Sequence, residues 1–324
     1  MKTIGTALAQ AARNVAEHCL AIQAGEVVSI VTDSADPDRI EIARAFWEEA
    51  RGKGAEVILA EMLPRKNSGE EPPAPITQLM AASNVVLCPT TKSLSHTQAR
   101  RNASARGARI ASLPGLTKEM VIRCLTADYG SIAALTKRVA EKLNRGSTFK
   151  VESELGTSLE LERRGRVVGA DTGLLTQPGD FGNLPAGEAF FAPMEGTANG
   201  KIVFDGSVAD LGKLTEPIEL EVEHGIARTV STSAASRELD RYLSAHGPAA
   251  YNIAELGVGT NDQAIVSGYI LEDEKVLSTV HIALGNNAGM GGTVNVPIHL
   301  DGLIRNATLY VDGELIMDKG KLAE

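Results

Sequence analysis

The sequence predicts an α/β N-terminal domain, with a parallel sheet and helices, over residues 1–146, and a β-rich α+β C-terminal domain over residues 147–324. The 324 residues exceed the roughly 100 to 200 residues that are usual for one domain. The first half alternates short apolar runs with helical patterns, whereas glycines and polar–apolar alternation dominate the second half. We therefore expect the domain boundary near residue 147.

Four nearly continuous apolar runs predict the parallel strands of the first domain, at residues 26–33, 55–62, 84–90 and 108–114. A helical pattern over residues 37–54 begins at Pro37, and two further helices are expected at 117–128 and 129–146. The segment 65–75 is expected to be a solvated loop, because no glycine-rich phosphate motif follows any of these strands. The order of these elements is typical of βαβ units.

The second domain begins with an alternating pattern over residues 147–168 that turns at Gly156. Glycines then recur at short spacing, which indicates a bent sheet of the barrel or sandwich kind.

Composition restricts the possible partners. The net charge of −9 offers no basic surface for phosphate groups, so neither nucleic acid nor an anionic membrane is expected as a partner. A small neutral or cationic ligand fits better, so the expected substrate is a small molecule or a short peptide. The three cysteines form no CxxC pair, which favours reduced thiols, and Arg13 and Glu17 interrupt the apolar N-terminal segment. We expect a cytoplasmic protein.

Two histidines lie inside strand-like apolar segments, His281 in "TVHIALG" and His299 in "VPIHLDGLI". Residues two apart in a strand share a face at about 6 to 7 Å, so His299 and Asp301 are expected to point to one site. Such a pair can bind a metal, or the aspartate can orient the histidine. A hydrogen-bonded core histidine is the alternative.

Two glutamates lie in similarly apolar or glycine-rich segments, Glu188 in "NLPAGEAFFAP" and Glu255 in "YNIAELGVGTN". Buried carboxylates are costly unless they are paired or bound to a metal. One shared site would explain five such placements, those of Glu188, Glu255, His281, His299 and Asp301. Carboxylate and imidazole ligands suit Zn, Co or Mn, and five ligands exceed the need of one tetrahedral zinc. The pattern predicts two adjacent divalent metal ions in a metal-binding catalytic C-terminal domain.

The motifs "GDFGNLPAGEAFFAP", "AELGVGTN", "TVHIALG" and "HLD", in this order, resemble the aminopeptidase T / aminopeptidase S family of two-metal exopeptidases over most of residues 150–315. The resemblance implies a homodimer and metal-ligand roles for the five residues named above. It also implies hydrolysis of an amide or peptide bond by a metal-activated water, with Glu188 bridging the ions. Glu255 is the ligand best placed to carry a proton.

One position departs from the peptidase pattern. Ala288 stands where that family has a tyrosine, and Asn286, Asn287 or Tyr251 would have to take over its role. The short loop before His299 looks like a second branch of the fold, which includes 2,5-dihydroxypyridine 5,6-dioxygenase. That branch holds one iron through two histidines and one carboxylate. Its first histidine stands where this chain has Glu255, and it lacks counterparts of Glu188 and His281.

Metal-dependent hydrolysis of the aminopeptidase type is therefore the leading hypothesis. The alternative is an Fe(II)-dependent ring-cleaving dioxygenase, which needs His299, Asp301 and one more ligand. A binding protein that retains only a structural metal is the third hypothesis, disfavoured because structural zinc sites use Cys and His.

Overall fold

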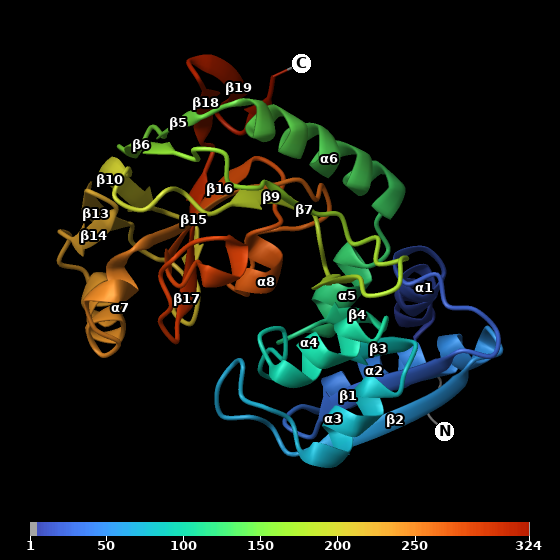
Figure 1. Ribbon diagram of the computed structural model, residues 1–324. Coiled ribbons are helices and arrows are strands. Elements are labelled where there is room, and N and C mark those ends of the chain that lie inside the picture. Colours follow the sequence, from blue (N-terminus) through green and yellow to red (C-terminus); the bar gives the residue numbers. More distant parts are fainter. Residues whose placement is uncertain (1–4, 324) are drawn as a thin grey trace. The chain divides into compact units, whose positions relative to one another are not determined.

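The computed structural model describes residues 5–323, which form two compact units (Figure 1). The α/β unit comprises the chain up to Ala133 together with Gly173–Ala186. The β-rich unit comprises Ala134–Thr172 and the chain from Gly187 onward. The short return of residues 173–186 to the α/β unit is a feature that a single boundary near residue 147 does not contain.

The α/β unit is built on a five-stranded parallel sheet in the order β2-β1-β3-β4-β8. Four of its strands lie within the predicted apolar runs. The fifth, β8, comes from the returning segment and pairs in parallel with β4, which the sequence pattern did not indicate. The strands are β1 Val27–Asp33, β2 Glu56–Met62, β3 Val85–Cys88, β4 Arg109–Ser112 and β8 Phe181–Asn183.

Helices cover this sheet in two groups. α1, α2 and α5 contact one another, and α3 contacts α4. The second group packs on side chains such as Val31, Val86 and Ile110. Helix α2 begins where predicted, because the Asp36 side chain accepts a hydrogen bond from the Asp38 amide. The helices are α1 Thr6–Asn14, α2 Pro37–Gly52, α3 Ala74–Ala81, α4 Gln98–Ala105, α5 Lys118–Cys124 and α6 Tyr129–Arg145, within which the chain passes to the β-rich unit.

The β-rich unit contains two antiparallel sheets. The eight-stranded sheet has the order β14-β13-β10-β6-β5-β18-β19-β20. Its β5–β6 hairpin turns at Gly156, whose φ of +106° suits glycine, as the sequence predicts. The strands are β5 Thr148–Glu152, β6 Ser158–Glu162, β10 Asn199–Phe204, β13 Ile218–Glu223, β14 Ile226–Thr229, β18 Thr308–Val311, β19 Glu314–Asp318 and β20 Lys321–Leu322.

The seven-stranded sheet has the order β12-β11-β17-β16-β15-β9-β7. Its strands are β7 Gly169–Asp171, β9 Glu188–Phe191, β11 Ser207–Val208, β12 Gly212–Lys213, β15 Ile253–Gly259, β16 Thr279–Gly285 and β17 His299–Arg305. One apolar core joins both sheets, with the Phe149 and Phe191 ring centroids 4.5 Å apart. Helix α7 (Ala234–Ser244) adds Leu239 and Leu243 to this core, and the short helix α8 (Ile270–Asp273) precedes β16.

An α/β domain followed by a β-rich domain is therefore the fold class, as predicted. Among residues 5–323, no helix has the length and apolar character needed to cross a membrane.

Candidate metal centre

The centre of the seven-stranded sheet has one apolar face and one polar face. Because side chains alternate along a strand, Leu256 and Val258 of β15 enter the apolar core, whereas Glu255 points to the opposite face. The same alternation sends Val280 and Ile282 of β16 into the core. It leaves Glu188, Glu255, His281, His299 and Asp301 together on the other face.

Strand register fixes the neighbours on this polar face. Glu255 and Asp301 flank Ala283 in one cross-strand row, where the small alanine leaves the space between the two carboxylates open. His281 lies opposite Gly257 in the next row. Glu188 lies opposite Gly259 and also opposite Asp171 of β7.

Two glycines of β15 make room for the polar groups. A Cβ atom at Gly257 would lie 2.0 Å from His281 Nε2, so the absence of a side chain lets the imidazole cross β15. A Cβ atom at Gly259 would lie 2.1 Å from the Val276 carbonyl oxygen. The backbone that carries Lys275 can therefore pass directly over this strand. The two glycines of "ELGVGTN" thus let neighbouring groups approach the backbone of the strand that this segment forms.

Glu255, His299 and Asp301 form one cluster of possible metal ligands, with one ligand atom of each within 4.8 Å of the others. His299 Nε2 lies 3.1 Å from Glu255 Oε2 and 3.6 Å from Asp301 Oδ1. The other ring nitrogen, Nδ1, lies 2.8 Å from the Asn286 carbonyl oxygen, which accepts its proton and leaves Nε2 to face the carboxylates. The His299 side chain is 28% exposed, so this cluster is open on one side. We call it the open cluster.

Glu188, Glu255 and His281 form the second cluster, again with one ligand atom of each within 4.8 Å of the others. His281 Nε2 lies 3.2 Å from Glu188 Oε2 and 3.4 Å from Glu255 Oε1. All three side chains are less than 10% exposed, and we call this the closed cluster. Glu255 belongs to both clusters, while the two histidines belong to different ones.

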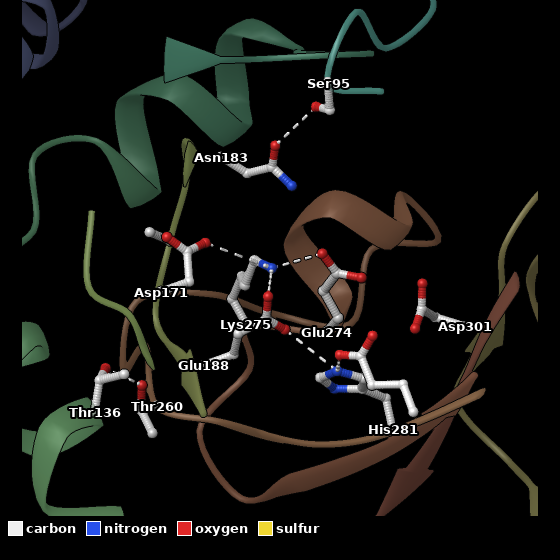
Figure 2. A network of polar contacts seen from close by, with 12 residues as sticks. Ser95, Thr136, Asp171, Asn183, Glu188, Thr260, Glu274, Lys275, His281 and Asp301 are labelled. Carbon is white, nitrogen blue, oxygen red and sulfur yellow. Dashed lines mark hydrogen bonds and ion pairs between the residues drawn. The ribbon is translucent and has the colours of Figure 1, made fainter. Parts of the chain in front are cut away.

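A buried lysine that the sequence reasoning missed lies beside the closed cluster. Figure 2 shows the Lys275 side chain pointing between Asp171, Glu188 and Glu274. Its Nζ lies 2.6 Å from Glu188 Oε1, 2.6 Å from Glu274 Oε1 and 3.9 Å from Asp171 Oδ2. Lys275 is fully buried, and the preceding acidic run is buried with it. "LEDEKVL" resembles a solvated charged turn, so only its position before an apolar strand hinted at burial.

The charges of these neighbours set the protonation states. Burial opposes ionisation of Glu188, but the Lys275 ammonium and the His281 imidazole together outweigh it and lower the pKa of that carboxyl. Burial likewise opposes protonation of His281, but Glu188 and Glu255 raise the pKa of the imidazole well above its usual value. Without a metal, the charges of neighbouring groups therefore alternate from the Lys275 ammonium to the Asp301 carboxylate. The groups between them are Glu188, His281, Glu255 and His299.

The balance between burial and neighbouring charge has different outcomes at His299 and at Glu274. Burial opposes protonation of His299, yet the Asp301 and Glu255 carboxylates raise the pKa of His299 well above its usual value. At the other end, burial dominates for Glu274 and raises its pKa to about 8, so this carboxyl is the one most ready to hold a proton.

The loop that positions His299 is itself anchored. Glu195 accepts hydrogen bonds from Asn287 Nδ2 at 2.9 Å and from the Thr293 amide at 2.8 Å, and it pairs with Arg166. Burial opposes its ionisation, but the Arg166 partner and these hydrogen bonds lower the pKa of Glu195 to about 2. The carboxylate therefore remains charged at neutral pH and holds the loop in place.

The residues considered as substitutes for the missing tyrosine have other partners. Asn286 Nδ2 donates to the Val296 carbonyl, and Asn287 donates to Glu195. Tyr251 donates to the Asp240 carboxylate at 3.0 Å. Ala288 begins a short 3-10 turn, and its methyl side chain has no donor to replace the tyrosine hydroxyl. The two asparagines thus shape the loop, which is the ordinary role of asparagine beside glycine.

Both clusters have the chemistry of a divalent cation site. Each offers one imidazole and two carboxylates, a donor set that suits Fe, Mn or Zn. Glu188 Oε2 supports the fit at the closed cluster, because this buried oxygen has no hydrogen-bond partner of acceptable geometry among residues 5–323. The open cluster fits because its ligand atoms converge beside an accessible histidine.

Lys275 weakens the prediction of two metal ions. The burial of five polar residues without separate partners favoured two metal ions, yet Lys275 is a partner for Glu188. The number of ions therefore no longer follows from burial alone.

Comparison with known proteins adds two likenesses in fold. The chain superposes on the structure of 2,5-dihydroxypyridine dioxygenase from Pseudomonas putida with a TM-score of 0.82 and 20% identity, covering 98% of this chain and 96% of the other. It superposes on wild-type AmpT from Thermus thermophilus with a TM-score of 0.73 and 17% identity, covering 98% and 99%. The second likeness supports the resemblance in fold to aminopeptidase T, but not membership of that family.

Sequence comparison supports the other branch. A curated 2,5-dihydroxypyridine 5,6-dioxygenase from Pseudomonas putida is 24% identical over 193 residues, and this match covers 55% of the chain and about half, 55%, of the relative. The family described as 2,5-dihydroxypyridine 5,6-dioxygenase (NicX) matches residues 7–324. Because this match covers nearly the whole sequence, the chain belongs to the 2,5-dihydroxypyridine 5,6-dioxygenase family of enzymes.

Proposed function

We propose that this chain is a metal-dependent dioxygenase that opens the ring of a hydroxylated pyridine, with one Fe(II) ion held by Glu255, His299 and Asp301. Membership of the family supports the reaction class. The observation that carries the site is the open cluster, where three ligand atoms lie within 4.8 Å of one another and His299 is 28% exposed. An oxygen-using site needs free positions next to its ion, and the open cluster can provide them.

The closed cluster does not require an ion under this proposal. Lys275 neutralises Glu188, and His281 can donate from Nε2 to Glu255 at 3.4 Å. Both residues then act as the buried support of Glu255, whose second oxygen faces His299 at 3.1 Å. This arrangement gives Glu188 and His281 a role without a second metal.

The residues of the open cluster would have different roles in binding Fe(II). Bound Fe(II) supplies the redox chemistry that reaction with oxygen requires. His299 donates from Nδ1 to the Asn286 carbonyl, which fixes the ring with Nε2 toward Glu255 and Asp301. Two carboxylates match the double charge of a divalent ion. The ligand set departs from two histidines and one carboxylate at Glu255, and this departure makes the ion preference a direct subject for experiment.

Oxygen uptake tests the proposal. Metal-free protein is reconstituted under argon with Fe(II), Mn(II) or Zn(II) and then mixed with 2,5-dihydroxypyridine in an oxygen-electrode cell. We expect one O2 consumed for each ring opened in the Fe(II) form and none in the zinc form, because zinc has no redox chemistry to offer. An Fe(II) form that binds its ion but consumes no oxygen with any dihydroxypyridine would contradict the proposal.

Hydrolysis of an amide or peptide bond is the second candidate. It is favoured by the closed cluster, where the shared Glu255 and the Glu188 Oε2 atom, which makes no hydrogen bond of acceptable geometry among residues 5–323, would suit a second ion of Zn, Co or Mn. Its test is turnover of amino-acid amides and dipeptides under argon by protein loaded with two ions per chain. Anaerobic release of the amine would favour this candidate over the dioxygenase.

The expected homodimer is a separate proposal, as are the small-molecule or short-peptide substrate and the cytoplasmic location. Light scattering during size-exclusion chromatography tests the dimer.

A further inference from the structure

Lys275 has the surroundings of a metal ion. Its Nζ is enclosed by Glu188 Oε1 at 2.6 Å, Glu274 Oε1 at 2.6 Å and Asp171 Oδ2 at 3.9 Å, and the residue is fully buried. A shell of carboxylate oxygens is the environment that hard divalent cations select in proteins. In this chain the Lys275 ammonium group lies inside such a shell of carboxylate oxygens (Figure 2).

Backbone contacts hold the segment that carries Lys275. The Lys275 carbonyl accepts the Asn261 amide at 2.8 Å, and the Leu277 amide donates to the Asn261 carbonyl at 3.0 Å. The segment lies directly over Gly259, where a Cβ atom would meet the Val276 carbonyl oxygen at 2.1 Å. The backbone of Lys275 is therefore fixed, and its fully buried side chain is held by the Glu188 and Glu274 oxygens.

Glu188 links Lys275 to the closed cluster. Its Oε1 binds the ammonium, and its Oε2 faces His281 Nε2 at 3.2 Å. An ion held by Oε2, His281 and Glu255 would share this carboxylate with the ammonium. Two cations on one buried carboxylate repel each other strongly, because the surroundings screen charge poorly. The positive charge of Lys275 thus both satisfies Glu188 and opposes a second ion there.

We infer that Lys275 takes the place of a second metal ion and limits this centre to a single divalent ion in the open cluster. The inference rests on the metal site of the proposed function and specifies how the chain excludes a second ion. In it, Lys275 is a positioning residue that acts through Glu188.

Counting bound ions tests this inference. Metal-free protein is titrated with Zn(II) under argon by calorimetry, and the bound metal is then measured per chain after gel filtration. We expect one ion for the natural chain and two for Lys275→Met, because the neutral side chain frees Glu188 for a second ion. The double variant Lys275→Met with Glu188→Gln should return to one ion. Lys213→Met, which removes an exposed lysine in the same unit, should keep one.

A second variant keeps the inference falsifiable if Lys275→Met does not fold. Glu188→Gln alone should still bind one ion, with a Kd raised by no more than about 10- to 100-fold, because Glu188 supports Glu255 from outside the open cluster. The inference fails if the natural chain binds two ions. It also fails if folded Lys275→Met binds only one, or if Glu188→Gln loses its ion.

The zinc count and the oxygen-uptake measurement can fail independently of each other. The zinc count is made without oxygen or substrate, so a chain that binds one zinc and never consumes oxygen overturns the proposed reaction and leaves the role of Lys275 intact. A chain that consumes oxygen with Fe(II) but binds two zinc ions overturns the role of Lys275 alone.

Discussion

The closed and open clusters use the same ligand types and share Glu255, yet they differ in what balances their charge. At the closed cluster, Lys275 provides a permanent positive charge 2.6 Å from Glu188. At the open cluster, positive charge comes from the protonation of two histidines, His299, whose side chain is 28% exposed, and His281 beside the shared Glu255. The closed cluster is neutralised by the fold itself, whereas the open cluster can exchange a proton for a metal ion.

This difference is the reason why we propose the open cluster as the site of the ion. A buried carboxylate is costly unless it is paired, so the closed cluster had to acquire a partner before the chain could fold. The Glu255 and Asp301 carboxylates of the open cluster are buried as well, but their pairing with His299 depends on a proton that a metal ion can replace. Functional sites commonly retain charge that the fold does not compensate. Under the proposed function, the closed cluster therefore supports Glu255, and the open cluster binds the ion.

Replacing His299 with alanine should have the largest effect. Because His299 is the only imidazole of the open cluster, we expect the affinity for the ion to fall by at least about 100-fold, more than the roughly 10- to 100-fold cost of losing an outer hydrogen-bond partner. Turnover should fall to background. Calorimetric titration and oxygen uptake measure the two effects. His18→Ala, which removes a histidine with a 65% exposed side chain, is the matched control. Turnover retained in His299→Ala would refute the role of the open cluster.

The next effect concerns the stability of the closed cluster. In metal-free Lys275→Met, the buried Glu188 carboxylate loses its counter-charge, and removing one partner of a buried ion pair costs about 3 to 5 kcal/mol. We expect the free energy of unfolding in urea with a chelator to drop by this amount. Adding Zn(II) should restore part of it. Lys213→Met should change it by less than about 0.5 kcal/mol, and a similarly small change in Lys275→Met would mean that the ammonium is not paired as described.

The pH dependence of metal binding should reveal which cluster takes the ion. Carboxylates raise the pKa of His299 well above its usual value, and a ligand imidazole must be neutral. Binding therefore displaces the His299 proton below this raised pKa, so affinity should increase about tenfold per pH unit from pH 6 upward and level off above the pKa. Calorimetry in buffers of different ionisation enthalpy counts the protons. One proton per chain fits the open cluster alone, and two would indicate that His281 also becomes a ligand.

Much of this site was predictable from the sequence, for a simple reason. Glu188, Glu255, His281, His299 and Asp301 are expensive inside apolar strands, and strand alternation specifies the face to which each one points. The first four parallel strands were predicted from their apolar runs, since strands buried on both faces lack alternation. The polar residues and the four strands are recognisable from neighbouring residues alone, so a single sequence is enough to predict them.

Lys275 and strand β8 could not be predicted in the same way. A lysine next to acidic residues usually lies in solvent, and its burial here depends on Gly259, which is distant in sequence and admits the backbone of Val276. The fifth strand depends on the return of residues 173–186 to the α/β unit, which no local pattern indicates. Both are consequences of tertiary contacts.

The smallest expected effect arises from the loop that orients His299. Glu195→Gln keeps the shape of the side chain but weakens its contacts with Arg166 and the Thr293 amide, which hold the loop whose Asn286 carbonyl accepts the His299 Nδ1 proton. Outer hydrogen-bond partners of metal-binding histidines are worth about 10- to 100-fold in affinity, and Glu195 acts one step further away, so we expect a loss of about 10-fold or less. The Kd for Zn(II) measures it, with Glu162→Gln, on an exposed Arg164 pair, as control. An unchanged Kd would mean that strand β17 alone orients His299, and the open cluster would then owe its geometry to the sheet and not to the loop.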